Sequence, residues 1–134
     1  MNETEVRRWF EEYLGAFAAC GRGESEVESI LHYYGVPLLF STDNGFVSLT
    51  TEEQVAAAVR QQIEQMRSAS YVRTEVLSSE VTVLNAASAL YRWTVSRRGR
   101  DGGEIGRQTF TDLLAGGTSG RRISVIAVHS PPPA

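Results

Sequence analysis

The chain has 134 residues, of which 42% are hydrophobic, and this size and composition are those of one ordinary globular domain. Its formal net charge of −3 argues against a nucleic-acid-binding protein, because such proteins usually carry a basic surface. All 13 basic residues are arginine, which excludes chemistry that depends on a lysine, such as Schiff-base formation.

The sequence gives no sign of a membrane segment, a secretion signal or a metal site. No run of residues reaches the roughly 18 apolar positions of a membrane span, and "MNETEVRRW" lacks the apolar core of a signal peptide. The single cysteine, Cys20, and the two histidines, His32 and His129, do not have the spacing of metal ligands. We therefore expect a cytoplasmic protein with no metal, no organic cofactor, and neither nucleic acid nor membrane as a partner.

The first predicted helix covers residues 6–20 and ends at Gly21. Apolar and aromatic residues recur there at helical spacing, with charged residues on the opposite side. The apolar stripe consists of Val6, Trp9, Phe10, Tyr13, Leu14, Phe17 and Cys20. Because Tyr13 lies near the middle of this stripe, the pattern predicts a polar hydroxyl among buried side chains.

The second predicted helix carries the tripeptide His32-Tyr33-Tyr34, which holds three groups able to move a proton. Ser25 with Glu28 predicts a capping box at its start. At about 100° per residue, Tyr34 falls within the apolar arc of the helix, Tyr33 at its border and His32 on the solvent side. We therefore expect the tripeptide not to be a catalytic cluster, and only Tyr34 to point inward.

A short hairpin and a third helix follow. "VPLLFS" and "FVSLT" are predicted strands, joined by a turn at "TDNG" in which Asn44-Gly45 is a strong hairpin signal. The third helix opens at "TTEEQ" with a capping box from Thr50 with Glu53 or from Thr51 with Gln54. Gln62 lies on its apolar stripe.

From Ser70 onward the hydrophobic period changes from 3.6 to two, which is the period of β-strands. The predicted strands are "YVRTEVLSSEVTVL", "SALYRWTVSRR", "EIGRQTFTDLLA" and "RRISVIAVHS". In the first of them the apolar alternation slips at Ser78-Ser79, which predicts a β-bulge and a bent strand. "GGTSG" is a predicted turn, and residues 131–134 are a predicted disordered, proline-rich tail.

Several polar side chains of these strands alternate with apolar ones. Asp112 shares a face with Phe110, Arg92 shares a face with Leu90, and His129 lies on the last strand. The sequence does not fix which face of the sheet is concave, so Asp112 is either a buried group or a solvent-facing one.

Four arginines, Arg97, Arg98, Arg100 and Arg107, surround the predicted turn at "RGRDGG". This turn fits neither a dinucleotide-binding glycine motif nor a phosphate-binding loop. We therefore expect the four arginines to form a solvated charge run.

The chain resembles the NTF2-like (cystatin-like, SnoaL-like) superfamily over nearly its whole length. The stretches that carry the resemblance are "ILHYYGVPLLF", "LTTEEQVAAAV" and "DLLAGGTSGRRISVIAVHS". The resemblance implies one α+β domain over residues 1–130. Its expected form is a cone, in which a curved, antiparallel, six-stranded sheet, mixed at an edge, wraps around three helices from the N-terminal half.

A more distant resemblance to ketosteroid isomerases of this superfamily implies roles for particular residues. In those enzymes a first-helix tyrosine and a protonated strand aspartic acid form an oxyanion hole. Tyr13 and Asp112 are similar to these two residues in position. The third element, a carboxylate base at the end of the first strand, has no counterpart in register, because Asp43 comes one place late, inside the turn. Polyketide cyclase-like relatives use an aspartate and a histidine, for which Asp112 and His129 are candidates.

Two functional interpretations remain open at this point. The preferred one is a pocket for a small hydrophobic molecule, acting as a lyase, isomerase or cyclase by cofactor-independent acid–base chemistry. Its candidate catalytic residues are Tyr13, Asp112 and His129, with Asp43 as another candidate base, and its candidate binding residues are Trp9, Phe17, Tyr34, Gln62 and Trp93. The alternative is a non-catalytic binding or dimerising module whose cone is filled. Either way the resemblance, together with apolar side chains on both faces of the strands, predicts a homodimer.

Overall fold

The computed structural model describes residues 1–116 and 120–131. Its elements are α1 (Glu3–Gly21), the 3₁₀-helix η1 (Val27–Tyr33), β1 (Tyr34–Thr42), β2 (Gly45–Leu49), α2 (Glu52–Ser68), β3 (Tyr71–Asn85), β4 (Ser88–Gly99), β5 (Glu104–Ala115) and β6 (Arg122–Val128). This order agrees with the sequence-based prediction. The predicted turn at residues 116–120 and the predicted tail at residues 131–134 lie largely outside the described residues.

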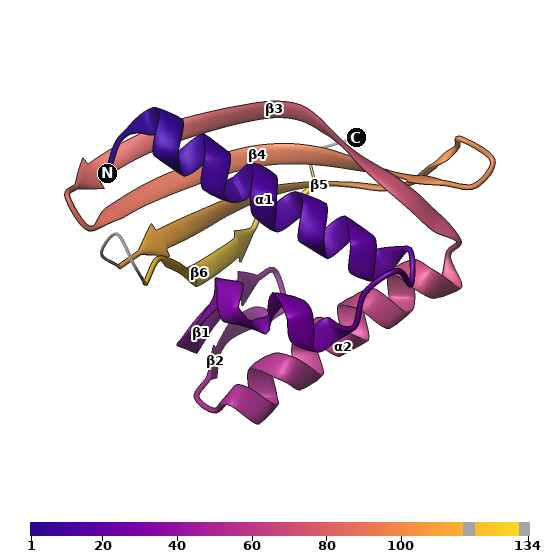
Figure 1. The fold of residues 1–134 in the computed structure, drawn as a ribbon, viewed down its shortest axis with the longest axis horizontal. Coiled ribbons are helices and arrows are strands. Elements are labelled where there is room, and N and C mark those ends of the chain that lie inside the picture. Colours follow the sequence, from indigo (N-terminus) through magenta and orange to yellow (C-terminus); the bar gives the residue numbers. More distant parts are fainter. Residues whose placement is uncertain (117–119, 132–134) are drawn as a thin grey trace.

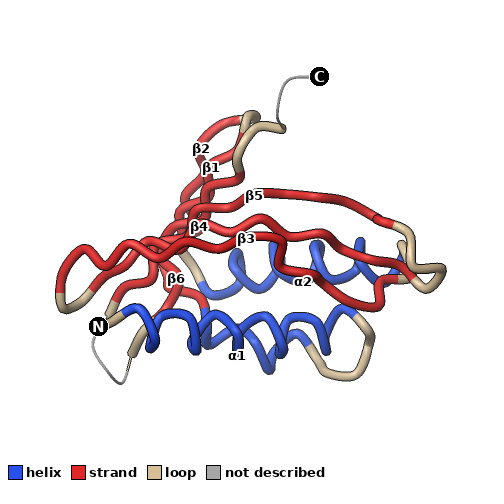
Figure 2. The backbone as a smooth tube through the Cα atoms, turned by 90° about the horizontal axis from the view of Figure 1, so that it is seen from above, coloured by secondary structure: helices blue, strands red, loops and turns tan. Residues whose placement is uncertain are grey.

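The six strands form one open sheet in the order β2-β1-β6-β5-β4-β3. Strand β1 runs parallel to β6, and all other neighbouring pairs are antiparallel. Both α-helices lie on the same side of this curved sheet (Figure 2), and α1 crosses in front of the long strands β3 and β4 in Figure 1. The predicted α+β cone is confirmed. None of the described helices is long and apolar enough to cross a membrane.

The packing of α1 identifies the concave face of the sheet. The ring of Phe10, which is 1% exposed, stacks on Tyr91 with ring centroids 4.1 Å apart, and it meets Trp93 edge-on at 5.7 Å. In β5, Asp112 pairs with Tyr91 and Phe110 pairs with Trp93. Directly opposed residues of neighbouring strands point to the same side. The concave face therefore carries the odd-numbered residues of β4 and the even-numbered residues of β5 up to Leu114.

The predicted bulge in β3 occurs one residue earlier than expected. The pairing of β3 with β4 shifts between Val76 and Ser78, so that Leu77 is the extra residue and its side chain is exposed. After this shift, Ser79 pairs with Trp93. Because of the extra residue, even-numbered positions of β3 such as Val76 face the concave side before the bulge, and odd-numbered positions such as Val81 face it afterwards. This change explains the slip in apolar phase seen in the sequence.

The second helix differs from the prediction in type and in capping. It is a 3₁₀-helix that begins at Val27, and no side chain caps its start. The N-cap position is Glu26, so Ser25 lies one residue too early, and the Glu28 carboxylate is bound by Arg60 at 3.0 Å. The orientation of the tripeptide is as predicted: His32 is exposed, Tyr33 is partly buried, and Tyr34 is 2% exposed as the first residue of β1.

The start of α2 follows one of the two predicted caps. The Thr51 side chain accepts a hydrogen bond from the Gln54 amide at 3.1 Å, and the Gln54 side chain accepts from the Thr51 amide at 3.3 Å. This capping box satisfies amide groups that a helix N-terminus otherwise leaves without partners. It fixes where α2 begins, and α2 in turn presents Val59 and Gln62 to the interior of the cone.

Candidate functional site

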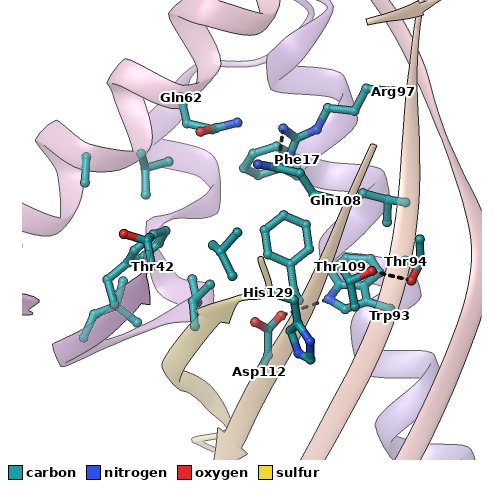
Figure 3. A pocket seen from close by; sticks show the side chains of 18 of the residues that line it. Phe17, Thr42, Gln62, Trp93, Thr94, Arg97, Gln108, Thr109, Asp112 and His129 are labelled. Atoms are coloured by element: carbon teal, nitrogen blue, oxygen red, sulfur yellow. Dashed lines mark hydrogen bonds between the residues drawn. The ribbon is translucent and has the colours of Figure 1, made fainter. Parts of the chain in front are cut away.

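A cavity of about 870 Å³ lies between the concave face of the sheet, α1, α2 and the hairpin of β1 and β2. Its volume is within the range of small-molecule sites in proteins, roughly 300–1,000 Å³. Aromatic and aliphatic side chains supply most of the wall, among them Phe17, Leu38, Phe40, Trp93, Phe110 and Ile126. Figure 3 shows polar groups at two ends, with Gln62, Arg97 and Gln108 at one and Asp112 at the other.

Asp112 is a buried carboxyl group in the wall of this cavity. The residue is 3% exposed, and its Oδ2 accepts a hydrogen bond from the Trp93 indole at 3.1 Å. Its Oδ1 is buried and has no hydrogen-bond partner among the described residues. Burial raises the pKa of Asp112 to about 7, although the hydrogen bond from Trp93 acts in the opposite direction. The carboxyl group is therefore largely protonated below neutral pH, and the proton belongs on Oδ1, because Oδ2 already accepts.

The hydroxyl groups of Tyr13 and Tyr34 form a second polar feature of the same wall. They are 2.7 Å apart and both residues line the cavity. Burial raises the pKa of both tyrosines, so that both remain un-ionised at neutral pH. Only one of the two hydroxyl protons is used between them, which leaves the other available as a donor.

The predicted binding residues divide into a group at the cavity and one residue away from it. Phe17, Tyr34, Gln62 and Trp93 line the cavity together with Tyr13 and Asp112. Trp9 is not part of the lining; it stacks against Tyr13 at 5.8 Å and meets Tyr33 edge-on at 5.4 Å. Successive positions four apart rotate by about 40° around a helix axis. This drift turns Trp9 toward η1 while Tyr13 and Phe17 face the cavity.

The two candidate bases lie at the edge of the site and not beside Asp112. The His129 imidazole hydrogen-bonds the Thr111 hydroxyl at 2.6 Å, and Thr111 faces the side of β5 opposite to Asp112. Asp43 lies exposed in the β1–β2 turn, where it accepts a hydrogen bond from the Ser130 hydroxyl. Both residues border the cavity, but the structure does not bring either together with the Asp112 carboxyl.

Arg97 corrects the prediction of a solvated arginine run. It is partly buried and lines the cavity, with its guanidinium carbon 5.9 Å from the centre of the Phe17 ring. The sequence contained the signal, because Arg97 follows Trp93 and Val95 at alternate positions of β4 and therefore shares their concave face. Gln108, which shares a face with Asp112 in β5, was missed in the same way. Arg107 also borders the cavity, but it is exposed and forms an ion pair with Glu104 at 3.0 Å.

The arrangement can bind an apolar body and donate hydrogen bonds to an oxygen atom of that body. The carboxyl group of Asp112 and the spare proton of the tyrosine pair are uncharged donors in an apolar wall, where hydrogen bonds are stronger than in water. In residues 1–116 and 120–131, no three His, Cys, Asp or Glu side chains come together in a way that could hold a metal ion.

The fold and the cavity together define a class, that of α+β cone proteins with a small-molecule-sized cavity between sheet and helices. The chain belongs to the family described as NTF2-like protein (DUF6841), whose family model matches residues 3–131. The predicted superfamily is thereby confirmed. No curated protein matches the chain.

Solved structures of low sequence identity share this fold. An NTF2-like protein with a cystatin-like fold from Novosphingobium aromaticivorans is 13% identical, with a TM-score of 0.71 over 98% of this chain and 82% of that one. A Xanthomonas campestris protein described as a calcium/calmodulin dependent protein kinase II association domain is 14% identical, with a TM-score of 0.71 over 100% and 91%. An NTF2-like protein of unknown function from Shewanella oneidensis is 13% identical, with a TM-score of 0.67 over 93% and 99%.

Proposed function

We propose that the protein binds a small apolar molecule carrying a carbonyl or phenolic oxygen, and that Asp112 in its neutral form donates a hydrogen bond to that oxygen. The observation that carries this proposal is the buried carboxyl group in the cavity wall, whose Oδ1 has no partner among the described residues. A buried polar group without a partner costs stability. A site that keeps such a group is typical of one that a ligand completes.

The shape and lining of the cavity support binding over the alternative of a filled cone. About 870 Å³ is open, although large side chains such as Phe17 and Trp93 already project into the cone. The walls are mostly aromatic and aliphatic, so burial of an apolar ligand is favourable by roughly 25 cal/mol per Å² of area removed from water. The few polar groups then set the orientation of the ligand, as in most small-molecule sites.

A second candidate function, acid–base catalysis of the isomerase, lyase or cyclase type, is favoured by the pKa of Asp112. An acid whose pKa lies near 7 is well matched to proton transfer at neutral pH. The same reaction needs a base, and His129 and Asp43 are the candidates at the rim of the cavity. Exchange of the α-hydrogens of a bound ketone with deuterated water, followed by NMR, tests this function directly. An exchange rate equal to that in buffer alone would contradict the catalytic function and favour the binding function.

Binding of a ketone, whose oxygen can only accept, should depend on the ionisation of Asp112. We expect 4-acetylbiphenyl to bind about tenfold more weakly near pH 8 than near pH 5.5. The reason is that only the neutral carboxyl group can donate, and its neutral fraction falls as the pH rises through a pKa of about 7. Titration calorimetry over this pH range measures the effect.

The matched variant for this experiment is Asp112→Leu, which removes the donor and keeps a side chain of similar size. We expect it to bind 4-acetylbiphenyl more weakly than the wild type at low pH and equally weakly at every pH. A wild-type affinity that does not change with pH, or a variant that binds as well as the wild type near pH 5.5, would contradict the role of Asp112.

We also propose a homodimer formed through the convex face of the sheet. A row of partly buried apolar side chains crosses four neighbouring strands on that face, formed by Leu39, Val125, Leu113 and Leu90. Neither α-helix covers this side of the sheet (Figure 2). A continuous apolar patch of this kind is typical of interaction surfaces.

Light scattering at tens of micromolar protein should give twice the chain mass of 14.7 kDa. The variant Leu113→Asp places a charge in the middle of the row and should shift the mass toward the monomer. Leu77→Asp is the control, because Leu77 is exposed at the bulge of β3 and lies outside the row. A wild-type chain that scatters as a monomer would contradict the proposal.

A further inference from the structure

Arg97 is a cation in the cavity wall without an acidic partner among the described residues. The guanidinium has five N–H donors, and its one hydrogen bond to another described side chain goes to the Gln108 amide oxygen at 3.5 Å. Its neighbours across the strands are Thr74 and Gly106, which carry no charge. A partly buried charge of this kind is costly unless an anion pairs with it.

The other charged groups of the cavity do not supply that anion. Asp43 and Asp112 are the acidic residues among the described residues of the lining. Asp43 is exposed in a turn and bound by Ser130, and Asp112 is held by Trp93 at the other end of the cavity. Burial lowers the pKa of Arg97, which nevertheless stays protonated at any physiological pH. The positive charge at this end of the cavity is therefore uncompensated by the described lining.

A continuous aromatic wall, consisting of Phe17, Tyr13 and Trp93, connects Arg97 with Asp112. The guanidinium carbon lies 5.9 Å from the centre of the Phe17 ring, and Phe17 lies 5.8 Å from the Tyr13 ring. Tyr13 lies 6.5 Å from Trp93, whose indole donates to Asp112. The two polar ends of the cavity are thus separated by three aromatic rings, a spacing that suits an elongated apolar body.

Two amide side chains lie near Arg97 at its end of the cavity, the partly buried Gln62 and the exposed Gln108. Gln62 from α2 and Gln108 from β5 converge with Arg97 from β4 (Figure 3). Their N–H groups are suited to a second oxygen atom once a first one is bound by the guanidinium. Planar, two-pronged donation by arginine matches the geometry of a carboxylate.

We propose that the cavity is a site for an elongated apolar monocarboxylate, whose carboxylate binds Arg97 and whose second oxygen, a carbonyl or hydroxyl at the far end, binds Asp112. This inference rests on the proposed function for the Asp112 end and adds the class of ligand. The Phe17 ring holds the guanidinium from one side by a cation–π contact, so that the donors of Arg97 are presented to the cavity.

Three matched probes test this assignment at pH 6, where Asp112 is mostly neutral. They are 4′-hydroxybiphenyl-4-carboxylate, which carries both groups, 4-hydroxybiphenyl, which lacks the carboxylate, and biphenyl-4-carboxylate, which lacks the hydroxyl. Calorimetry on the wild-type protein should show the first probe binding at least tenfold more tightly than the second. Such a factor corresponds to one charge-assisted hydrogen-bonded pair.

Variants at Arg97 separate the two ends of the site. Arg97→Gln should abolish the advantage of the carboxylate while changing the affinity for 4-hydroxybiphenyl by no more than twofold. Arg97→Lys keeps the charge but loses the planar pair of N–H donors, so it should retain part of the advantage of the carboxylate. It serves as the second variant if Arg97→Gln does not fold. Arg73→Gln is the control, because this exposed arginine lies outside the cavity lining and pairs with Glu75, and the advantage should be unchanged.

The outcomes distinguish the inference from the proposed function. A carboxylate that adds nothing in the wild type, or an advantage that survives in Arg97→Gln, overturns the inference, while loss of 4-hydroxybiphenyl binding in Asp112→Leu still supports the proposed function. Loss of carboxylate binding in Arg97→Gln together with no effect of Asp112→Leu on any probe overturns the proposed function and with it the two-ended ligand. Absence of binding by all three probes overturns both.

Discussion

Replacement of Asp112 by asparagine should stabilise the protein at neutral pH, by about 1–3 kcal/mol at pH 8. The ordinary pKa of an aspartate is 3.8, and burial raises that of Asp112 to about 7. Each factor of ten in the ionisation constant is worth about 1.4 kcal/mol, so the ionisable group costs the fold roughly 4 kcal/mol at alkaline pH. Asparagine has no charge to lose, although its buried amide N–H groups reduce the gain.

The sign of this effect depends on pH in a definite way. A carboxyl group whose pKa is raised on folding ionises first in the unfolded chain, so stability decreases as the pH rises from about 4 to about 7. Asp112→Asn should therefore be roughly 1–2 kcal/mol less stable than the wild type at pH 4, where the cost of its buried amide dominates, and should overtake the wild type as the pH rises toward 7. Glu5 and Glu104, whose pKa values are lowered chiefly by hydrogen bonds from Arg121 and Ser96, act in the opposite direction. They are present in both proteins and cancel in the difference.

Urea unfolding of both proteins at several pH values measures this difference. Asp43→Asn is the control, because this exposed carboxylate should change the free energy of unfolding by no more than about 0.5 kcal/mol. NMR titration of the Asp112 carboxyl carbon checks the cause directly. A pKa near 4, or a destabilised Asp112→Asn protein at pH 8, would show that the carboxylate is ionised in the fold and would remove the basis of the proposed donor.

The sequence predicts which residues of a strand share a face better than it predicts whether that face is the concave or the convex one. Strict alternation in β5 placed Asp112 with Phe110 and Leu114, and the structure keeps all three on one face. The same alternation in β4 joins Arg97 to Trp93 and Val95, yet its position beside a turn favoured a solvated interpretation. The period of a strand gives relative faces. Only the packing of α1 against Tyr91 fixes which face is concave.

Where the predicted and observed positions of a residue differ, the cause is a tertiary contact that no local sequence pattern contains. Trp9 belongs to the apolar stripe of α1, but η1 supplies Tyr33 as its neighbour, and η1 is placed by tertiary contacts. His129 lies just beyond β6, and its side is decided by the register of β5 with β6, which contains an irregularity between Leu113 and Leu114. The segment at the start of η1 is held from α2, where Arg60 binds Glu28 and Arg67 binds the Ser25 carbonyl, and these contacts are not visible in the local sequence.

The two polar ends of the cavity differ in the kind of donor they offer. Asp112 donates only while neutral, so its contribution falls as the pH rises, whereas Arg97 keeps its charge throughout. A ligand with one ionised and one neutral oxygen group matches this difference. Its carboxylate is poorly suited to the apolar surroundings of Asp112, where an added negative charge would face a group that itself tends to ionise. We therefore expect the ligand to bind with its carboxylate at Arg97 and its neutral oxygen at Asp112.

Truncation of Tyr34 to alanine should destabilise the protein by roughly 3–5 kcal/mol, whereas His32→Ala should cost no more than about 0.5 kcal/mol. Tyr34 is 2% exposed, and its ring meets that of Tyr13 edge-on at 5.7 Å. Its loss leaves a cavity and removes the hydrogen-bond partner of the Tyr13 hydroxyl. His32 is exposed, and its contact with the Tyr33 ring at 4.1 Å lies on the surface.

A third variant separates packing from hydrogen bonding at Tyr34. Tyr34→Phe keeps the ring and removes only the hydroxyl, so it should cost about 1–2 kcal/mol, the price of leaving the buried Tyr13 hydroxyl without this partner. Urea unfolding of the three variants under one set of conditions should therefore give losses in the order Tyr34→Ala, Tyr34→Phe, His32→Ala. Equal losses from Tyr34→Ala and His32→Ala would mean that the chain leaving η1 is rotated, and that Tyr34 does not belong to the cavity wall. A Tyr34→Phe protein as stable as the wild type would instead mean that Tyr13 finds another partner, so that no spare donor is available from this pair.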